Sequence, residues 1–236
     1  MIEDLRTVAN KELREILSRS RRFSGRRTVL RAAVLPLLLG LFFGYQFAHS
    51  NNAFSRGIGA FYVGLMAMSI AGNLIADAIA GERERHTLET LLASPVSEIA
   101  ILGGKLGAVI SYAWGLAMVQ LAAVEIGASL GGHSFTVPEL VIVAFLSLLE
   151  ATLAAAFALQ FSLSAPTVRV ATRKQAQYSI VVTIAASGVN VVAATPDNSL
   201  TRVAVIAAAA ATLTLLDVAL ISLGRARFRR GRLVLD

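Results

Sequence analysis

The sequence predicts an all-α integral membrane protein, a bundle of six spanning helices preceded by an amphipathic helix, with both termini in the cytoplasm. The 236 residues are 56% hydrophobic and only 16% charged, which is too apolar for an ordinary soluble domain. The apolar residues also gather in six stretches of about 20 residues or more, each long enough to cross a hydrocarbon layer of roughly 30 Å. Basic residues stand at the edges of these stretches, as in membrane proteins.

Residues 1–28 form a polar, basic lead before the first apolar stretch. Its apolar positions recur at near-helical spacing: Ile2, Leu5, Ala9, Leu13, Ile16 and Leu17. This pattern predicts an amphipathic helix on the inner membrane surface, acting as a topological anchor or flanking a docking surface for a soluble partner. The apolar run that follows exceeds the roughly 7 to 15 residues of a signal peptide, so we expect a retained first span.

The six apolar stretches define a transmembrane domain of residues 29–224, followed by a basic tail of residues 225–236. The expected spans lie near residues 30–48, 57–80, 104–130, 137–164, 176–194 and 201–223. Glycines four residues apart let two helices approach closely and predict a compact bundle. These pairs are Gly40 and Gly44, Gly103 and Gly107, and Gly127 and Gly131.

The basic residues predict the orientation. Of 22 lysines and arginines, all except Arg56 and Arg202 fall on one side of the predicted spans, and that side is expected to be cytoplasmic. An even number of spans with both termini inside explains this bias. The net charge of +7 follows from the same placement, so we expect the lipid bilayer rather than a nucleic acid as its counterpart, in a multi-pass protein of the cell membrane.

Four polar residues inside the predicted spans are candidate functional sites: Asn73, Gln120, Glu150 and Asp217. Ionisable groups are costly in a membrane and often functional, and Glu150 lies near the middle of the fourth span. Hydrogen bonding between helices explains such residues equally well. A third interpretation, an intramembrane enzyme, would use Glu150 and Asp217.

The sequence offers little else for catalysis. Cysteine is absent and the three histidines are far apart, so we expect no thiol chemistry and no metal site. The pair Gly104-Lys105 resembles the end of a phosphate loop, but Ile99 and Leu106 occupy the positions where that motif requires Gly and Ser or Thr. We therefore expect neither a cofactor nor ATP hydrolysis on this chain.

A charged break separates the second and third predicted spans. It begins Gly81-Glu82-Arg83-Glu84-Arg85-His86-Thr87-Leu88-Glu89 and continues through Leu91-Leu92 and Ser94-Pro95 to Gly104-Lys105. Dense charge is too costly among lipid tails, so the break must lie in water, at the cytoplasmic face. This ordered string resembles the ABC-2 family of ATP-binding-cassette transporter permeases, with His86 where that family frequently carries glycine.

The resemblance implies a transmembrane subunit that works as a homodimer or heterodimer with two cytoplasmic ABC ATPase subunits, which would bind ATP and Mg, and it favours export. It also implies that residues 82–98 contain the coupling helix that sits in an ATPase groove. In that segment leucines can form an apolar stripe and charged residues offer complementarity for docking. The candidate docking residues are Glu82, Arg83, Glu84, Arg85, Thr87, Leu88, Glu89, Leu91 and Leu92.

Two alternatives to this coupling role remain open. The charged break could be a solvated turn whose charges only fix topology, although its continuation through Thr87, Leu88 and Glu89 to Pro95 argues against this. The chain could also be a non-transporting membrane partner of an ABC-type ATPase, acting in assembly or signalling.

Overall fold

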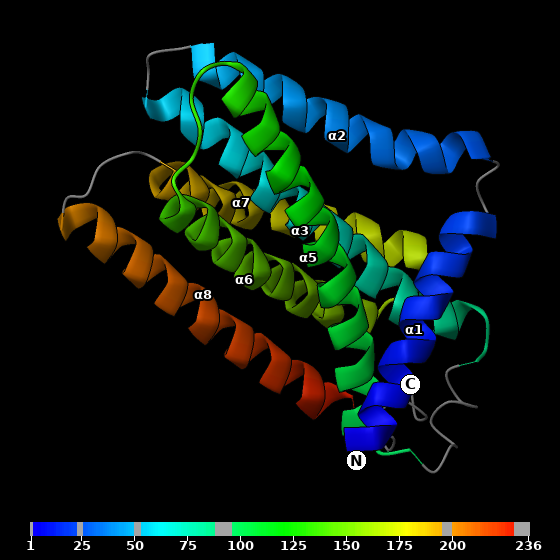
Figure 1. The fold of residues 1–236 in the computed structure, drawn as a ribbon. Coiled ribbons are helices and arrows are strands. Elements are labelled where there is room, and N and C mark those ends of the chain that lie inside the picture. The colour runs from blue at the N-terminus through cyan, green and yellow to red at the C-terminus, as the bar shows by residue number, and fades with distance from the viewer. Residues whose placement is uncertain (1, 23–25, 50–52, 88–95, 195–199, 229–236) are drawn as a thin grey trace.

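The computed structural model describes residues 2–22, 26–49, 53–87, 96–194 and 200–228, and within them the chain is almost entirely helical (Figure 1). The prediction of an all-α fold is confirmed. The helices are α1 (Ile2–Arg22), α2 (Arg26–His49), α3 (Ala53–Glu84), α5 (Glu98–Leu130), α6 (Val137–Ser162), α7 (Val168–Ala193) and α8 (Leu200–Arg227).

Four helical segments of the described chain are long and apolar enough to cross a membrane: Gly57–Glu84, Glu98–Leu130, Val137–Ser162 and Leu200–Arg227. Helix α7 qualifies only when its two parts, which meet at 59°, are taken as one span. Its first part carries three basic residues, which shorten the apolar run. In α2 the apolar segment Pro36–Gln46 is shorter than a span. The chain is thus a multi-pass membrane protein, and the count of six spans stays a prediction.

Helix α3 is at the centre of the bundle and packs against α2, α5, α6 and α7. Its residues Val63, Ala67, Ala71 and Ile75 recur every four positions and are fully buried, as expected for one face of a helix. Helix α8 instead packs mainly on α6 at the edge of the bundle (Figure 1). Most of its apolar side chains are exposed, which suits a helix that faces lipid tails.

Glycines allow α2 and α5 to cross closely, in keeping with the compact bundle that their spacing predicted. A Cβ atom on Gly44 would lie 2.1 Å from the carbonyl oxygen of Val124, and one on Gly127 would lie 2.3 Å from that of Leu41. A larger residue at either position would force the helices apart. The pair Gly103 and Gly107 differs, because a Cβ on Gly107 would meet nothing within 4 Å.

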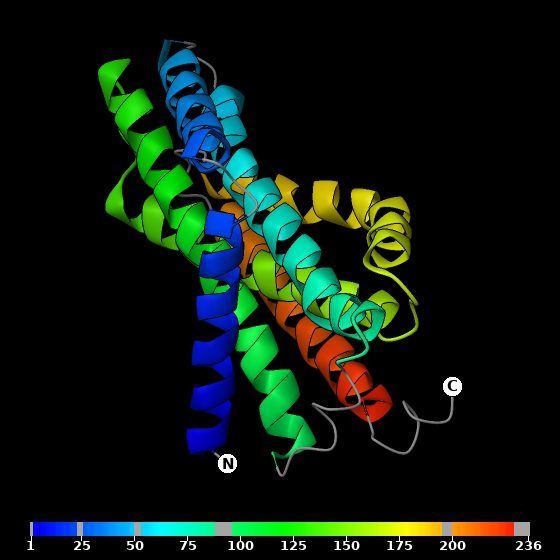
Figure 2. The same cartoon turned by 90° about the vertical axis from the view of Figure 1, so that its right-hand side faces the viewer.

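The ends of α3, α6 and α8 lie at the same end of the bundle as the starts of α5 and α7 (Figures 1 and 2). We call this the basic end, because it carries the basic residues of these helix ends. The structure therefore groups residues that the charge pattern had assigned to one side. Which side of the membrane this end faces stays a prediction.

Helix α1 packs along the first part of α5, at the basic end (Figure 2). A Cβ on Gly104 would lie 2.7 Å from Val8, and one on Gly103 would lie 3.3 Å from Leu5, so the two helices are in close contact. Helix α5 has 33 residues and is about 50 Å long at 1.5 Å per residue. It is longer than the hydrocarbon layer of roughly 30 Å, so part of it can extend into water with α1 beside it. The position of α1 at a membrane surface stays a prediction.

Candidate functional site at the basic end of the bundle

The charged break begins with a hydrogen-bonded turn that ends α3. The backbone N–H of Thr87 donates to the carbonyl of Glu82 at 2.9 Å, and that of His86 donates to Arg83 at 3.0 Å. These two bonds form a Schellman motif, which requires a residue in the left-handed region after the helix. His86 adopts that conformation, with φ of 56°. Glycine adopts this conformation with the least strain. The turn therefore explains why glycine is frequent at this position in the family that the sequence resembles.

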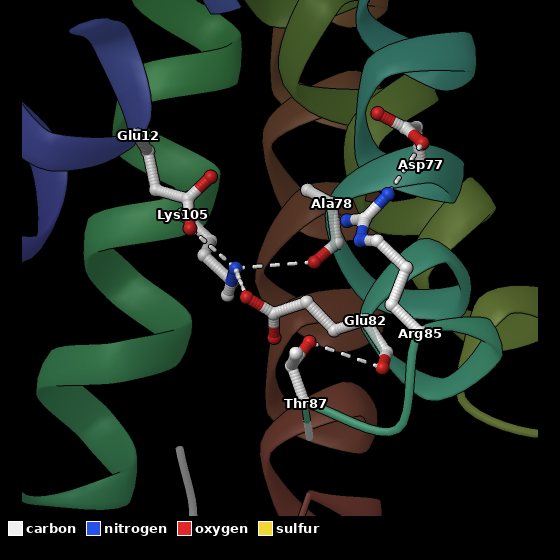
Figure 3. A network of polar contacts seen from close by, with 7 residues as sticks. All are labelled: Glu12, Asp77, Ala78, Glu82, Arg85, Thr87 and Lys105. Carbon is white, nitrogen blue, oxygen red and sulfur yellow. Dashed lines mark hydrogen bonds and ion pairs between the residues drawn. The ribbon is translucent and has the colours of Figure 1, made fainter. Parts of the chain in front are cut away.

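Lys105 is the centre of a buried ion network (Figure 3). Its ammonium group donates to a carboxylate oxygen of Glu12 on α1, to Oε1 of Glu82 on α3 at 2.8 Å, and to the carbonyl of Ala78 at 3.1 Å. Only 2% of the lysine side chain is exposed. A buried charge is tolerated when it is paired and hydrogen-bonded. The network therefore links three helices, with Lys105 itself contributed by α5.

Arg83 binds the end of α6. Its guanidinium group donates to the carbonyl of Leu163 at 2.7 Å and to that of Ala165 at 3.0 Å. These carbonyls follow the last turn of α6, where unpaired acceptors and the helix dipole both favour a positive charge. Arg83 therefore fastens the end of α3 to the end of α6.

Glu84 binds the start of α7. Its Oε2 accepts a hydrogen bond from the backbone N–H of Val168 at 3.0 Å, the first residue of that helix. The hydroxyl oxygen of Thr167 accepts a second one, from Val170 at 3.3 Å. A negative charge is favourable at a helix start. Arg83 thus places a positive charge at the negative end of the α6 dipole, and the adjacent Glu84 places a negative charge at the positive end of the α7 dipole.

Arg85 and Thr87 complete the part of the break that the structure describes. Arg85 lies 3.8 Å from Asp77, with 43% of its side chain exposed, and an exposed pair of this kind contributes little stability. The hydroxyl of Thr87 donates to the carbonyl of Glu82 at 3.2 Å. Glu84, Arg85, His86 and Thr87 are all exposed, so a partner could reach this turn.

The structure assigns the charged residues of the break a role that the sequence did not suggest. Glu82, Arg83 and Glu84, expected to dock a partner, also bind other helices of this chain, and their docking role stays a prediction. The other four candidate docking residues lie outside the described residues: Leu88, Glu89, Leu91 and Leu92. The helix after the break, α5, begins at Glu98 and is capped by Ser97, whose hydroxyl oxygen accepts from the N–H of Ala100 at 3.3 Å.

Glu12 and Lys105 were not identified as site residues from the sequence. A signal for each was present, because Glu12 falls on the apolar face of α1, between Leu5, Ala9 and Ile16. Lys105 likewise stands in an otherwise apolar segment of α5. A charge on an apolar face usually indicates a buried partner, but the sequence did not show which residues would pair.

Among the candidates inside the spans, Glu150 lies at a junction of three helices. Asn190 on α7 donates its amide to both carboxylate oxygens, each at 2.9 Å, and both side chains are completely buried. Gly64 on α3 makes room for them, because a Cβ there would lie 2.1 Å from Oε2 of Glu150. The arrangement is the hydrogen bonding between helices that was one of the three interpretations of Glu150.

The other three candidates lie apart from Glu150. Asp217 on α8 is 5% exposed, and neither carboxylate oxygen has a hydrogen-bond partner among the described residues. Gln120 is buried beside Gly40 at the crossing of α2 and α5. Asn73 is exposed and donates to the carbonyl of Ser69 in its own helix. No hydrogen bond or ion pair between described residues joins Glu150 to Asp217, the pair that the enzyme interpretation requires.

At the opposite end of the bundle, Arg202 is also used within the fold. Its guanidinium group donates to the carbonyls of Val192 and Ala193 at the end of α7, and it lies 3.8 Å from Glu139 at the start of α6. Only 9% of its side chain is exposed. One of the two basic residues outside the basic end thus serves as a helix cap rather than as a free surface charge.

No three Asp, Glu or His side chains in the described part of the chain are grouped so that they could hold a metal ion. The contacts at the basic end are between charged side chains and helix ends.

Comparison with known proteins adds an independent finding. The sequence profile described as ABC-2 family transporter protein matches residues 26–190, from the start of α2 to Asn190 on α7. A search of curated proteins found no match. The matched region covers well over half of the 236 residues and includes Lys105, the charged break and the Glu150–Asn190 pair. The chain belongs to the ABC-2 family of transporter proteins.

Proposed function

We propose that the chain is the transmembrane permease subunit of an ATP-driven exporter in the cell membrane. Two separate cytoplasmic ATPase subunits would bind ATP and Mg and hydrolyse ATP, and a second permease subunit would complete the transporter. Membership of the ABC-2 family supports this role and implies association with ABC ATPases in general. Export, and the hydrolysis of ATP by separate subunits, are inferred.

The observation that carries the proposal is the buried network of Lys105. The segment that connects α3 to α5 is held at both of its ends, because Glu82 near the end of α3 binds Lys105 near the start of α5. Glu12 adds α1 to the same group. A partner that pushed on the connecting segment would therefore displace three helices together instead of bending a loose loop.

Two further contacts would carry the displacement into the rest of the bundle. Arg83 holds the end of α6 and Glu84 holds the start of α7. Both side chains extend from the last turn of α3, directly before the connecting segment. Helices α1, α3, α5, α6 and α7 are thus joined at the end where we place the ATPase.

The proposal can be tested by co-purification with an ATPase whose gene lies beside that of this chain. We expect the wild-type chain, carried in membranes, to retain the ATPase through affinity purification, and Glu89→Lys to reduce the retained amount. Glu3→Lys on the exposed side of α1 is the matched control and should bind normally. Failure of the wild-type chain to retain the ATPase would contradict the proposal.

Reconstitution of the purified complex into vesicles then separates a transporter from a non-transporting partner. A permease must move a candidate cargo in an ATP-dependent manner. Stable binding of the ATPase without ATP-dependent movement of any candidate cargo would instead support the assembly or signalling role.

A further inference from the structure

A groove of about 140 Å³ lies between α3, α6 and α7. Its lining residues on α6, such as Leu153 and Phe157, belong to the second half of that helix, and most of those on α7 belong to its first half. The groove therefore lies in the half of the bundle nearer the basic end. Lys105 and Glu82 do not line it.

The lining combines apolar side chains with polar but uncharged ones. Helices α3 and α7 contribute six side chains that carry hydroxyl or amide groups: Ser69, Asn73, Thr172, Gln175, Ser179 and Thr183. No residue of the lining carries a charge. Such a surface within an apolar bundle is suited to a neutral group that forms hydrogen bonds, because a bare ion would lack a counter-charge.

Helix α7 directs its polar residues into the groove. Thr172 and Gln175 in the first part of the helix, and Ser179 and Thr183 in the second, are spaced by three or four residues and so share a face within each part. All four line the groove. On another face, Val181 is 72% exposed, as expected for a side chain among lipid tails. The polar groups thus face the neighbouring helices.

Contacts between helices do not account for these polar groups. The hydroxyl of Thr172 donates within its own helix, to Val168 at 3.0 Å. Among the described residues, no hydrogen bond involves the side chain of Ser179 or Thr183. Gln175 is only 8% exposed, and its amide oxygen is buried without a hydrogen-bond partner in the described part of the chain. A bound group with a hydroxyl or N–H donor would satisfy that oxygen.

Gly72 on α3 fixes the position of Gln175. A Cβ on Gly72 would lie 1.8 Å from the amide nitrogen of Gln175, so the glutamine side chain rests directly on the helix backbone. Any larger residue at position 72 would push the glutamine away. The groove is thus built by a glycine on one helix and an amide on another.

We propose that this groove is a hydrated binding site for an uncharged, hydroxyl- or amide-bearing group of the transported molecule, with Gln175 as its anchoring residue. Its volume corresponds to on the order of four or five water molecules, at about 30 Å³ each, so it accepts a small polar group rather than a large molecule. That group could belong to a free polyol or to the headgroup of a lipid. The assignment to cargo rests on the proposed function, whereas the binding itself does not.

The absence of cysteine permits a direct test in the full chain. Ser179→Cys replaces only an oxygen by sulfur in the groove, and Val181→Cys provides a matched control on the exposed face of the same helix. In membrane vesicles, we expect 2-hydroxyethyl methanethiosulfonate, a neutral hydroxyl reagent, to modify Cys at 179 at least tenfold faster than at 181. Equal rates, or no modification at 179, would overturn a hydrated groove.

Protection from this reagent tests binding and separates the two sources of the ligand. We expect glycerol, 1-monooleoylglycerol or both to slow the modification of Ser179→Cys severalfold. Protection by glycerol indicates a free polyol, and protection by the monoacylglycerol alone indicates a lipid headgroup. Protection by neither probe would overturn the proposal.

Two further variants test the anchoring role of Gln175. In the Ser179→Cys chain, Gln175→Leu should abolish protection while the modification rate without ligand stays within about twofold, and Gly72→Ala should act in the same way by displacing the glutamine. Retained protection in both would overturn the role of Gln175. Because no ATPase is needed, the result stands apart from the co-purification test of the proposed function.

Discussion

The ammonium nitrogen of Lys105 on α5 lies 2.8 Å from Oε1 of Glu82 on α3. One residue precedes the segment that connects the two helices, and the other follows it. The contact joins the two helices on which a partner bound to that segment would act. Glu12 on α1 completes the network from its other side. The network therefore joins α1, α3 and α5 on both sides of the connecting segment.

Lys105→Met is expected to destabilise the protein strongly. The substitution leaves the carboxylates of Glu12 and Glu82 buried beside each other without a cation, and breaking a buried pair in this way costs about 3–5 kcal/mol. A thermal melt of the purified protein, followed by size-exclusion chromatography, would show a lower midpoint. Lys174→Met at an exposed position of α7 should melt like the wild type. Equal midpoints for the two variants would show that the network does not hold the helices together.

Glu84→Lys is expected to loosen the start of α7. The variant loses the acceptor for the N–H of Val168 and places a positive charge at a helix start, where loss of a cap costs roughly 1 kcal/mol. Amide hydrogen exchange at Val168 should become several times faster, while exchange in the middle of α6 should not change. Unchanged exchange at Val168 would refute the capping role and return Glu84 to the list of partner-docking residues.

His86→Gly is expected to stabilise the turn that ends α3. His86 has φ of 56°, and a left-handed conformation costs a residue with a side chain roughly 1–2 kcal/mol, a cost that glycine avoids. The greater freedom of glycine in the unfolded chain offsets part of the gain. The melting midpoint should therefore rise slightly, whereas Thr87→Gly, at the neighbouring position, should not raise it. A lower midpoint for His86→Gly would mean that the imidazole makes a stabilising contact.

Gly64→Ala is expected to destabilise the junction of α3, α6 and α7. The added methyl group would lie 2.1 Å from Oε2 of Glu150, and overpacking of this kind typically costs 1–3 kcal/mol. Combining it with Glu150→Ala, which removes the clashing carboxylate, should cost less than the sum of the two single changes. Strictly additive effects on the melting midpoint would contradict the contact.

Much of the architecture could be predicted from the sequence. Apolar stretches predicted an all-α membrane protein, and the edge charges grouped the helix ends that the structure brings together. Glycine spacing predicted close helix packing, which the structure shows where α2 and α5 cross at Gly44 and Gly127. The number of spans could not be settled in this way, because α2 and α7 each combine a short apolar run with a basic segment.

The use of individual charges at the basic end could not be predicted. Glu82 and Arg83 were interpreted as docking residues because they are charged and lie at a membrane face. Their partners come from distant parts of the chain, Glu82 binding Lys105 and Arg83 binding Leu163 and Ala165. Sequence spacing carries no information about contacts of this range. The same limit hid the pairing of Glu150 with Asn190, although Glu150 had been recognised as a polar group within a span.

The central claim is that an ATPase acts on this chain at the basic end, through the segment that follows α3. The most direct test is photo-crosslinking from p-benzoylphenylalanine in place of His86, which is exposed on the turn after α3, and in place of His133, which is exposed at the opposite end of the bundle. With the candidate ATPase present, we predict a crosslinked product from position 86 and none from position 133. Capture from position 133, or from neither position, would contradict the claim.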